Sequence, residues 1–453
     1  MSQPSRPPGP PGVFTRGSIL RHVLVMTATG SIGLMAVFFV DLLSLIYVSR
    51  LGNHNATAGV GYATQVGFFL VSVNIGLIIA VGALVSRAAG AGDRAAAKRL
   101  ATNCLMHIFW LTSLTAAIVF PLRRPILSLL GARGEALDVA SDFLAITLPS
   151  TPALGVGMGL SAILRAVGDA RRAMYVTLSG AILTAFADPA LIFGMGLGVK
   201  GAAISTVMSR CMFVIVGLHG VMRVHGMLAR PERRATLRDF WPMMAIAIPA
   251  IVTNLAPPVA NSYSLRVFSE FGESIVAAYS IIDRIVPVAF GVLFAMSGAV
   301  GAIIGQNFGA GAIDRVRSTL VSCFLVASVY AGSVWFQMWL GAPLIATLFG
   351  ATGDTARLVV FFCTWGGAAW MALGCLFVAN SAFNNLGYPV LSTLFNWGRA
   401  TLGTIPFVTL GAHYWGAEGG QAGIFLGAAL FGLGSIVTAF WVVGRLANRP
   451  RMS

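Results

Sequence analysis

Twelve apolar runs, each long enough to cross a lipid bilayer as a helix, constrain this chain more than any other feature. A helix needs about 20 residues to cross the hydrocarbon core, and every run meets that length. The runs lie at approximately 22–49, 61–86, 101–121, 138–164, 173–194, 201–224, 241–267, 275–304, 317–340, 356–383, 391–412 and 421–444. The predicted fold class is therefore an all-α integral membrane protein with twelve transmembrane helices.

The low content of charged residues supports this prediction and excludes nucleic acid as a partner. Only 10% of the 453 residues are charged and 57% are hydrophobic, whereas an ordinary soluble domain is about 25% charged. The net charge of +15 could suit nucleic acid. Such binding needs a basic face or stripe, however, and the basic residues here lie at the ends of apolar runs. We therefore expect membrane lipid, and no nucleic acid, around the protein.

The cysteines and histidines do not indicate a metal site. The five cysteines (Cys104, Cys211, Cys323, Cys363 and Cys375) lie inside apolar runs without CxxC spacing. The six histidines are scattered and form no HExxH-type pair. We predict no metal and no bound cofactor. Because no nucleophile–base set or repeated pore loop occurs, we predict neither an enzyme nor a channel.

The basic residues at the ends of the runs predict the orientation of the chain. Twelve spans place both termini on one side of the membrane, and that side carries 20 Lys and Arg residues against 7 on the other. Because cytoplasmic loops are enriched in Lys and Arg, we expect both termini in the cytoplasm. The predicted protein is a multi-pass monomer in the inner or plasma membrane of the cell.

The chain repeats itself after 218 or 219 residues. Three glycine-containing stretches match in order, and the matched pairs are Gly90 with Gly309, Gly168 with Gly387, and Gly198 with Gly416. A duplicated unit of six helices explains the matches, and both copies enter the membrane in the same orientation because six is even. The predicted divisions are a disordered cytoplasmic tail (1–16), an amino-terminal lobe (17–224), a cytoplasmic linker (225–240), a carboxy-terminal lobe (241–445) and a second cytoplasmic tail (446–453).

Asp41 is the most informative single residue, because it interrupts an otherwise apolar run. It is the only acidic or basic side chain between Arg21 and Arg50 apart from His22. Placing a carboxylate deep in hydrocarbon costs about 2.5–3.5 kcal/mol, so acids in such positions are usually functional. The alternative is an acid that caps or pairs locally and never moves charge.

Asp188 lies beside Pro189 in the fifth run, where the two residues predict a polar notch. Proline has no N–H, so the carbonyl of Ala185 one turn earlier loses its helical partner and can accept from water or a cation. Thr184, four residues before Asp188, adds a hydroxyl on the same helical face. The alternative is a proline kink in which Asp188 has a structural role only.

The order and spacing of several motifs resemble the multidrug and toxic compound extrusion (MATE) family. These motifs are SRLG after an acid in the first run, AGAGD before the third, LRAVGDARRA after the fourth, DPALIFGMGLGVKGAA across the fifth and sixth, and GQNFGAG after the eighth. The resemblance covers nearly the whole chain. It implies a V-shaped exporter with two pseudo-symmetric six-helix lobes that antiports organic cations against H⁺ or Na⁺ by alternating access.

The positions of the membrane acids resemble the DinF-like branch of that family. Asp41 and Asp188 match the acid pair of the amino-terminal lobe in that branch, and Thr206 matches a hydroxyl beside the pair. Where the NorM-like branch carries acids in its second lobe, this chain offers polar amides, among them Asn254, Asn261 and Asn380. The resemblance therefore implies that cation coupling takes place in the first lobe. The chain departs from the family pattern at Thr184, where an asparagine is usual, and at Leu34, where a glutamine is frequent.

Asp283 and Arg284 form a second charged point inside an apolar run. Residues adjacent in sequence do not face each other on a helix, so the two do not form a self-contained ion pair. A role in transport and a structural contact with a neighbouring helix are both open.

Together these features predict a secondary active exporter of amphipathic, mostly cationic compounds. We favour H⁺ as the coupling ion, because two neighbouring carboxylates in low dielectric can take up and release a proton near neutral pH. Na⁺ is the alternative. Its oxygen ligands would come from Asp41, Asp188, Thr184, Thr206 and the carbonyl of Ala185. A lipid-linked precursor flippase of the same superfamily is a further alternative, which a cationic cavity would favour and the acids of the first lobe do not.

The charge asymmetry predicts the accessibility of the linker. In a cysteine-free variant, a single cysteine in residues 225–239 should resist membrane-impermeant thiol reagents in intact cells and react after permeabilisation. Arg133→Cys, on the opposite predicted side, is the control and should react in intact cells. Labelling of the linker cysteine without permeabilisation would contradict the orientation.

Overall fold

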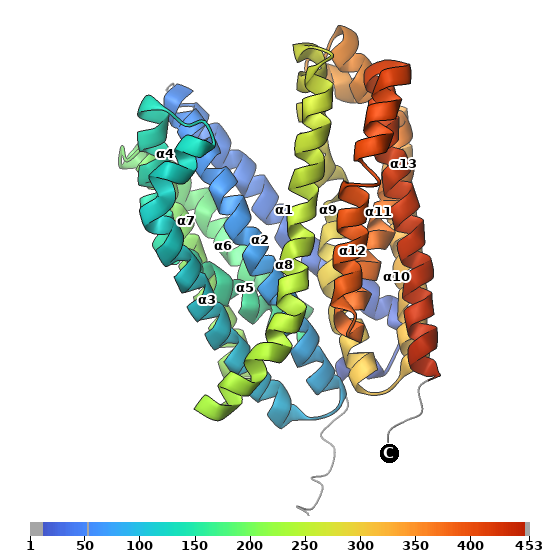
Figure 1. The fold of residues 1–453 in the computed structure, drawn as a ribbon. Helices are drawn as coiled ribbons and strands as arrows, with labels where there is room; N and C mark the ends of the chain where they lie inside the picture. The colour runs from blue at the N-terminus through green and yellow to red at the C-terminus, as the bar shows by residue number, and fades with distance from the viewer. Residues whose placement is uncertain (1–11, 52–53, 449–453) are drawn as a thin grey trace, which may run out of the picture. The chain divides into compact units, whose positions relative to one another are not determined.

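A computed structural model describes residues 12–51 and 54–448, which form helices and no strand (Figure 1). This confirms the predicted all-α class. The helices in chain order are η1 (Val13–Thr15), α1 (Ile19–Ser49), α2 (His54–Gly90), α3 (Arg94–Leu129), α4 (Gly134–Thr147), η2 (Leu148–Ser150), α5 (Thr151–Ala166), α6 (Ala170–Pro189), η3 (Ala190–Gly194), α7 (Val199–Leu218), η4 (His219–Val224), α8 (Arg233–Ser269), α9 (Glu273–Gly309), α10 (Ile313–Leu348), α11 (Gly353–Leu386), α12 (Pro389–Ala400) and α13 (Ile405–Ala447).

The chain divides by packing into two compact units. The first contains Met1–Val13 and Ile32–Ile251, and the second contains Phe14–Ser31 and Val252–Ser453. Helices α1 and α8 therefore each contribute to both units. The change of unit falls after Ser31 in α1 and after Ile251 in α8, at points 220 residues apart. The packing units thus follow the repeat, but they exchange the first halves of these two helices and do not divide at the linker.

The eleven apolar helical stretches of the described residues correspond to the twelve predicted spans, because the last stretch contains two. That stretch, Pro389–Ala447, is 59 residues long, and the predicted runs 391–412 and 421–444 both lie within it. The backbone of α13 leaves helical geometry at Trp415 and Gly416, and Gly416 has a φ of +61°. Glycine adopts this left-handed conformation at little cost. The chain can therefore change direction there.

Glycines on both sides of Gly416 show that the two arms of α13 pack against each other in opposite directions. A Cβ added to Gly427 would lie 1.8 Å from the carbonyl oxygen of Gly403, just before α13, and one added to Gly411 would lie 2.1 Å from that of Gly419. Contacts that move outward from Gly416 on both arms are those of a helical hairpin. Because no side chain separates the backbones, the arms approach more closely than larger residues would allow.

The fourth predicted span is two helices joined by a short turn. Helix α4 ends at Thr147, and Pro149, which has no N–H, lies in the 3₁₀ turn η2. Arg210 of α7 partners the interrupted backbone: its Nη1 donates to the carbonyl of Thr147 (2.7 Å) and to the hydroxyl of Ser150 (2.9 Å). The buried arginine in the sixth span is therefore held by a break in the fourth.

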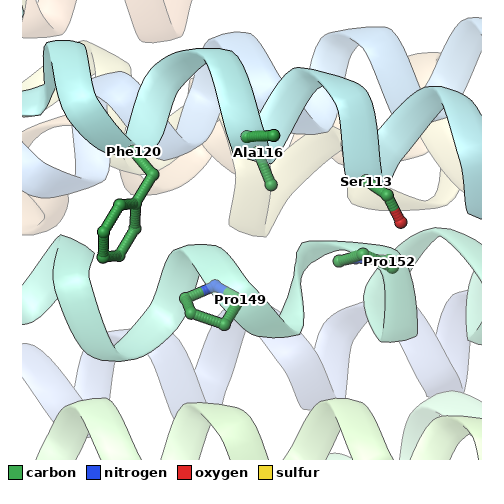
Figure 2. A pocket seen from close by; sticks show the side chains of 6 residues that line it. Ser113, Ala116, Phe120, Pro149 and Pro152 are labelled. Atoms are coloured by element: carbon green, nitrogen blue, oxygen red, sulfur yellow. The ribbon is translucent and has the colours of Figure 1, made fainter.

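A small pocket lies beside this turn in the first unit. Figure 2 shows Ala116 and Phe120 of α3 on one side and Pro149 and Pro152 on the other. Ser113 is the one polar residue in its lining. The pocket is thus suited to an apolar group, and it contains none of the charged residues singled out above.

The predicted disordered tail is ordered from Val13 onward, while residues 1–11 lie outside the described part of the chain. Phe14 is 2% exposed and belongs to the second unit. Its N–H donates to Gln306 Oε1 (2.9 Å), and Arg315 Nη2 donates to its carbonyl (3.0 Å). The proline-rich composition suggested a loose tail, but one apolar ring with partners for its backbone is enough to fix this segment.

The predicted linker packs along the first unit, and its last residues already belong to α8, which begins at Arg233. The hydroxyl of Thr102 accepts a hydrogen bond from the N–H of Ala229 (2.8 Å). His225 Nε2 lies 2.8 Å from Asp169 Oδ2. Partial burial alone would raise the pKa of Asp169, but hydrogen bonds from Arg172 and His225 outweigh it and lower that pKa. These contacts tie the linker to α3 and to the start of α6.

The close packing of the α13 arms predicts the effect of adding one methyl group. Gly427→Ala should lower the free energy of unfolding by about 1–3 kcal/mol, because the new Cβ overlaps the backbone of Gly403. Gly444→Ala is the control, since nothing lies within 4 Å of its added Cβ in the same helix. Thermal unfolding of the purified variants tests this. Equal stability of the two variants would argue against the hairpin.

Candidate functional site

Asp188 is a buried carboxylate in the first unit, held by a helix far away in sequence. It lies in the last turn of α6 and is 1% exposed. The hydroxyl of Ser44 on α1 donates to its Oδ2. Hydrogen bonds to a charged acceptor are stronger than those between neutral groups. The bond therefore links α1 to α6 at the point where α6 carries its only acid.

A close approach of the two helices makes this bond possible. A Cβ added to Gly33 of α1 would lie 2.3 Å from Thr177 Oγ1 of α6, so only glycine fits there without a shift. Ser44 follows Asp41 by three residues, and residues at that spacing share one face of a helix. One face of α1 thus presents both a carboxylate and a hydroxyl near Asp188.

Asp41 and Asp188 lie close enough to interact electrostatically, although their exposure differs. Asp41 is exposed at the surface of the molecule, whereas Asp188 is buried. Two carboxylates at short range repel each other when both are ionised, so one proton or cation between them relieves the repulsion. The structure therefore brings together the two acids that the sequence singled out.

The second oxygen of Asp188 has no hydrogen-bond donor among the described residues. Ser205 of α7 is fully buried beside Asp188, but neither its Oγ nor Asp188 Oδ1 has a partner with good hydrogen-bond geometry in that part of the chain. A buried carboxylate oxygen without a donor is costly. A proton, a water molecule or a small cation would satisfy it.

The backbone widens directly after Asp188. Helix α6 ends at Pro189, and residues Ala190–Gly194 (η3) form a π-helical turn in which the N–H of Met195 bonds to the carbonyl of Ala190 (2.9 Å). Such turns are rare and often occur at functional sites. Pro189 supplies no N–H to the carbonyl of Ala185. The predicted polar notch therefore coincides with an irregular turn.

The two predicted supporting hydroxyls point back to their own helices. Thr184 donates to the carbonyl of Gly180 and Thr206 to that of Ala202, each at 3.0 Å. Neither donates to Asp188, although each oxygen keeps lone pairs that could face a cation. Their supporting role stays a prediction. The residues that the sequence analysis missed are Ser44 and Ser205, and the spacing of Ser44 from Asp41 was the available signal.

The remaining polar candidates belong to the second unit. Asp283 and Arg284 of α9 are both exposed and form no ion pair in the described part of the chain. Asn261 of α8, 220 residues after Asp41, is exposed as Asp41 is, and Asn254 of the same helix is half-buried. Asn380 of α11 has a buried Oδ1 without a partner among the described residues. Within those residues, no group of three or more His, Cys, Asp or Glu side chains could hold a metal ion.

Comparison with known proteins decides the family. The MatE family model matches residues 31–190 and 249–410, which together make up more than half of the chain. The chain belongs to the MatE family. The two matched stretches begin 218 residues apart, in agreement with the repeat. A MatE protein is a membrane transporter and not an enzyme, as predicted.

Relatives of this MatE protein cover most of its length. The FAD transporter of Shewanella oneidensis is 28% identical over 407 residues, which are 88% of this chain and 89% of the relative. The probable multidrug resistance protein NorM of Pseudomonas putida is 30% identical over 275 residues, 58% of each chain. The crystal structure of the Vibrio cholerae MATE transporter VcmN matches with a TM-score of 0.89 over 96% of this chain and 98% of that one, at 21% identity. This likeness supports the fold.

The contact between α1 and α6 predicts a charge-dependent effect on stability. Ser44→Ala should lower the free energy of unfolding by about 1–3 kcal/mol, because Asp188 loses its only well-formed hydrogen bond among the described residues. The loss should shrink when Asp188→Asn is also present, since a neutral amide needs the donor less. Ser49→Ala, an exposed position on the same helix, should change stability by less than about 0.5 kcal/mol. Equal losses on the two Asp188 backgrounds would show that the bond is not charge-assisted.

Proposed function

We propose that this MatE protein is a secondary active exporter of amphipathic, mostly cationic organic compounds, driven by H⁺ through Asp41 and Asp188. The observation that carries the proposal is the buried carboxylate of Asp188, held by Ser44 of α1, with a second acid in electrostatic reach and one oxygen without a donor among the described residues. The name of the Pseudomonas putida relative, a probable multidrug resistance protein, supports the substrate class.

The pair has the chemistry that proton coupling requires. When both acids are ionised they repel each other and attract a cationic compound; when one is protonated, that attraction falls. Protonation also changes the bond between Ser44 and Asp188, because a neutral carboxyl accepts more weakly than a carboxylate. A proton that enters from outside thus releases the exported cation and loosens α1 from α6 within the first unit. Proton and compound compete for the same negative charge, which makes the exchange obligatory.

The proposal includes the membrane setting. We place the protein in the inner or plasma membrane with both termini in the cytoplasm, on the basis of the Lys and Arg asymmetry. The acid pair in the first unit, together with the amides in the second, supports a place in the DinF-like branch. A monomer suffices for this mechanism, because Asp41, Asp188 and Ser44 all belong to one unit of one chain.

Two alternatives have specific support. Na⁺ could replace H⁺, because Asp188 Oδ1 and Ser205 Oγ are two buried oxygens without hydrogen-bond partners in the described residues. Na⁺ binding needs several oxygens, and the hydroxyls of Thr184 and Thr206 would have to contribute their lone pairs. The second alternative concerns the substrate: FAD is a candidate, because the Shewanella oneidensis relative that matches 88% of this chain is named as a FAD transporter.

Neutralising either acid should abolish net export. Asp41→Asn and Asp188→Asn should each remove proton-driven transport and leave folding intact, since the loss of a membrane charge relieves a desolvation cost. Asp142→Asn, at an exposed acid of the same unit paired with Lys200 (3.2 Å), is the control and should transport normally. Drug resistance of cells at matched expression provides the first measurement.

Transport in reconstituted vesicles separates the coupling ions. We expect an inside-acid gradient without Na⁺ to drive uptake of a quaternary ammonium dye by protein whose cytoplasmic face points outward. A permanently charged dye avoids simple pH partitioning, and protein-free vesicles control for leakage. Uptake that needs a Na⁺ gradient and ignores pH would replace H⁺ by Na⁺. Normal uptake by Asp41→Asn and Asp188→Asn would remove the acid pair from the mechanism.

A further inference from the structure

Arg399 is a membrane arginine without a partner in the second unit. It lies in the last turn of α12, within the predicted run 391–412, and is half-buried. Its Nε is buried and has no hydrogen-bond partner, and the guanidinium forms no ion pair among residues 12–51 and 54–448. Arg210, the half-buried membrane arginine of the first unit, differs because two oxygen atoms accept from it.

The groups around Arg399 do not neutralise it. Tyr279 of α9 is 7% exposed and interacts with the guanidinium electrostatically. The nearest hydroxyls along the chain are already used as donors, because Thr401 bonds to the carbonyl of Trp397 (2.7 Å) and Thr404 to that of Arg399 itself (2.9 Å). The cation therefore has an aromatic hydroxyl beside it and no carboxylate bonded to it in the described part of the chain.

The cost of such a group indicates what is missing. A guanidinium presents five N–H donors and stays charged at any physiological pH. A charged side chain in a membrane span is expensive and is normally paired or faces a ligand pathway. The partial exposure of Arg399 leaves access for an outside group. Carboxylates and phosphates match the planar fork of donors and would supply the missing charge.

We propose that Arg399 is an anion-binding site of the second unit, which takes the carboxylate or phosphate group of an amphipathic organic anion. Tyr279 lies beside the site as an additional polar group. The inference rests on the proposed export function for its substrate class, because it extends that class from cations to anions. Coupling stays with Asp41 and Asp188, so the anion site is a second, separately testable element.

Two dyes of similar shape and opposite charge test the site. Carboxyfluorescein is anionic and rhodamine 6G is cationic, and both contain a xanthene ring. We expect purified protein in neutral phosphatidylcholine nanodiscs to bind carboxyfluorescein, and Arg399→Gln to weaken that binding about tenfold or more. Rhodamine 6G binding should change less than about twofold, because that dye lacks the anionic group which the guanidinium pairs with. Arg266→Gln removes an exposed arginine of the same unit and is the matched control.

Further measurements separate a soluble anion from a lipid headgroup. Nanodiscs that contain phosphatidylglycerol should raise the unfolding temperature of the native protein, and not that of Arg399→Gln, if a lipid phosphate occupies the site. Carboxyfluorescein should do so if a soluble anion occupies it. Either result supports the anion site and identifies its source. Arg399→Lys keeps the charge with fewer donors and should retain part of the effect, which distinguishes binding from folding.

The proposal is overturned if neither the dye nor the lipid distinguishes Arg399→Gln from the native protein. It is also overturned if Arg399→Gln loses both dyes equally, because that result indicates a structural role. Binding is measured here without a proton gradient. A failure of the anion site therefore leaves Asp188→Asn transport results untouched, and a failure of proton coupling leaves the dye results untouched.

Discussion

Hydrocarbon offers no hydrogen-bond partner, so every polar group in a membrane span must find one within the chain or do without. Most hydroxyls here solve the problem locally, as Thr184 and Thr206 do by bonding to the carbonyl one turn earlier in their own helix. The exceptions are therefore informative. Ser44 bonds across to α6, and Arg210 bonds across to the break between α4 and α5. Both contacts lie where a helix carries an acid or loses its regular backbone.

The duplicated units share a weak point but differ in its charge. In the first unit, α6 ends at Pro189 and continues as a π-helical turn. In the second, the corresponding span is interrupted between α12 and α13, where the N–H of Gly403 bonds to the carbonyl of Gly398 (2.8 Å). The first of these irregular segments adjoins Asp188, and the second adjoins Arg399. Duplication thus preserved an irregular backbone at similar depth, while the charged group beside it changed sign.

The sequence was sufficient for the parts of the fold that depend on hydrophobicity and charge. Asp41 and Asp188 were identified because an acid in an apolar run is rare, and the spans were identified because their length is set by the bilayer. Ser44 and Ser205 were missed because a serine in a membrane helix normally bonds to its own backbone, and only the tertiary contact of α1 with α6 and α7 gives them a different role. Phe14 was missed for a related reason: its burial depends on Gln306 and Arg315, almost 300 residues away.

That long-range contact has a consequence for biosynthesis. The first half of α1 belongs to the second unit, together with Phe14, and its partners on α9 and α10 are translated only after the whole first unit. The earliest helix to enter the membrane therefore waits, half packed, until two thirds of the chain has been made. The units cannot mature one after the other as independent domains do. During that interval the start of α1 depends on lipid, or on an assembly factor in the membrane, to cover the side chains that α9 and α10 later bury.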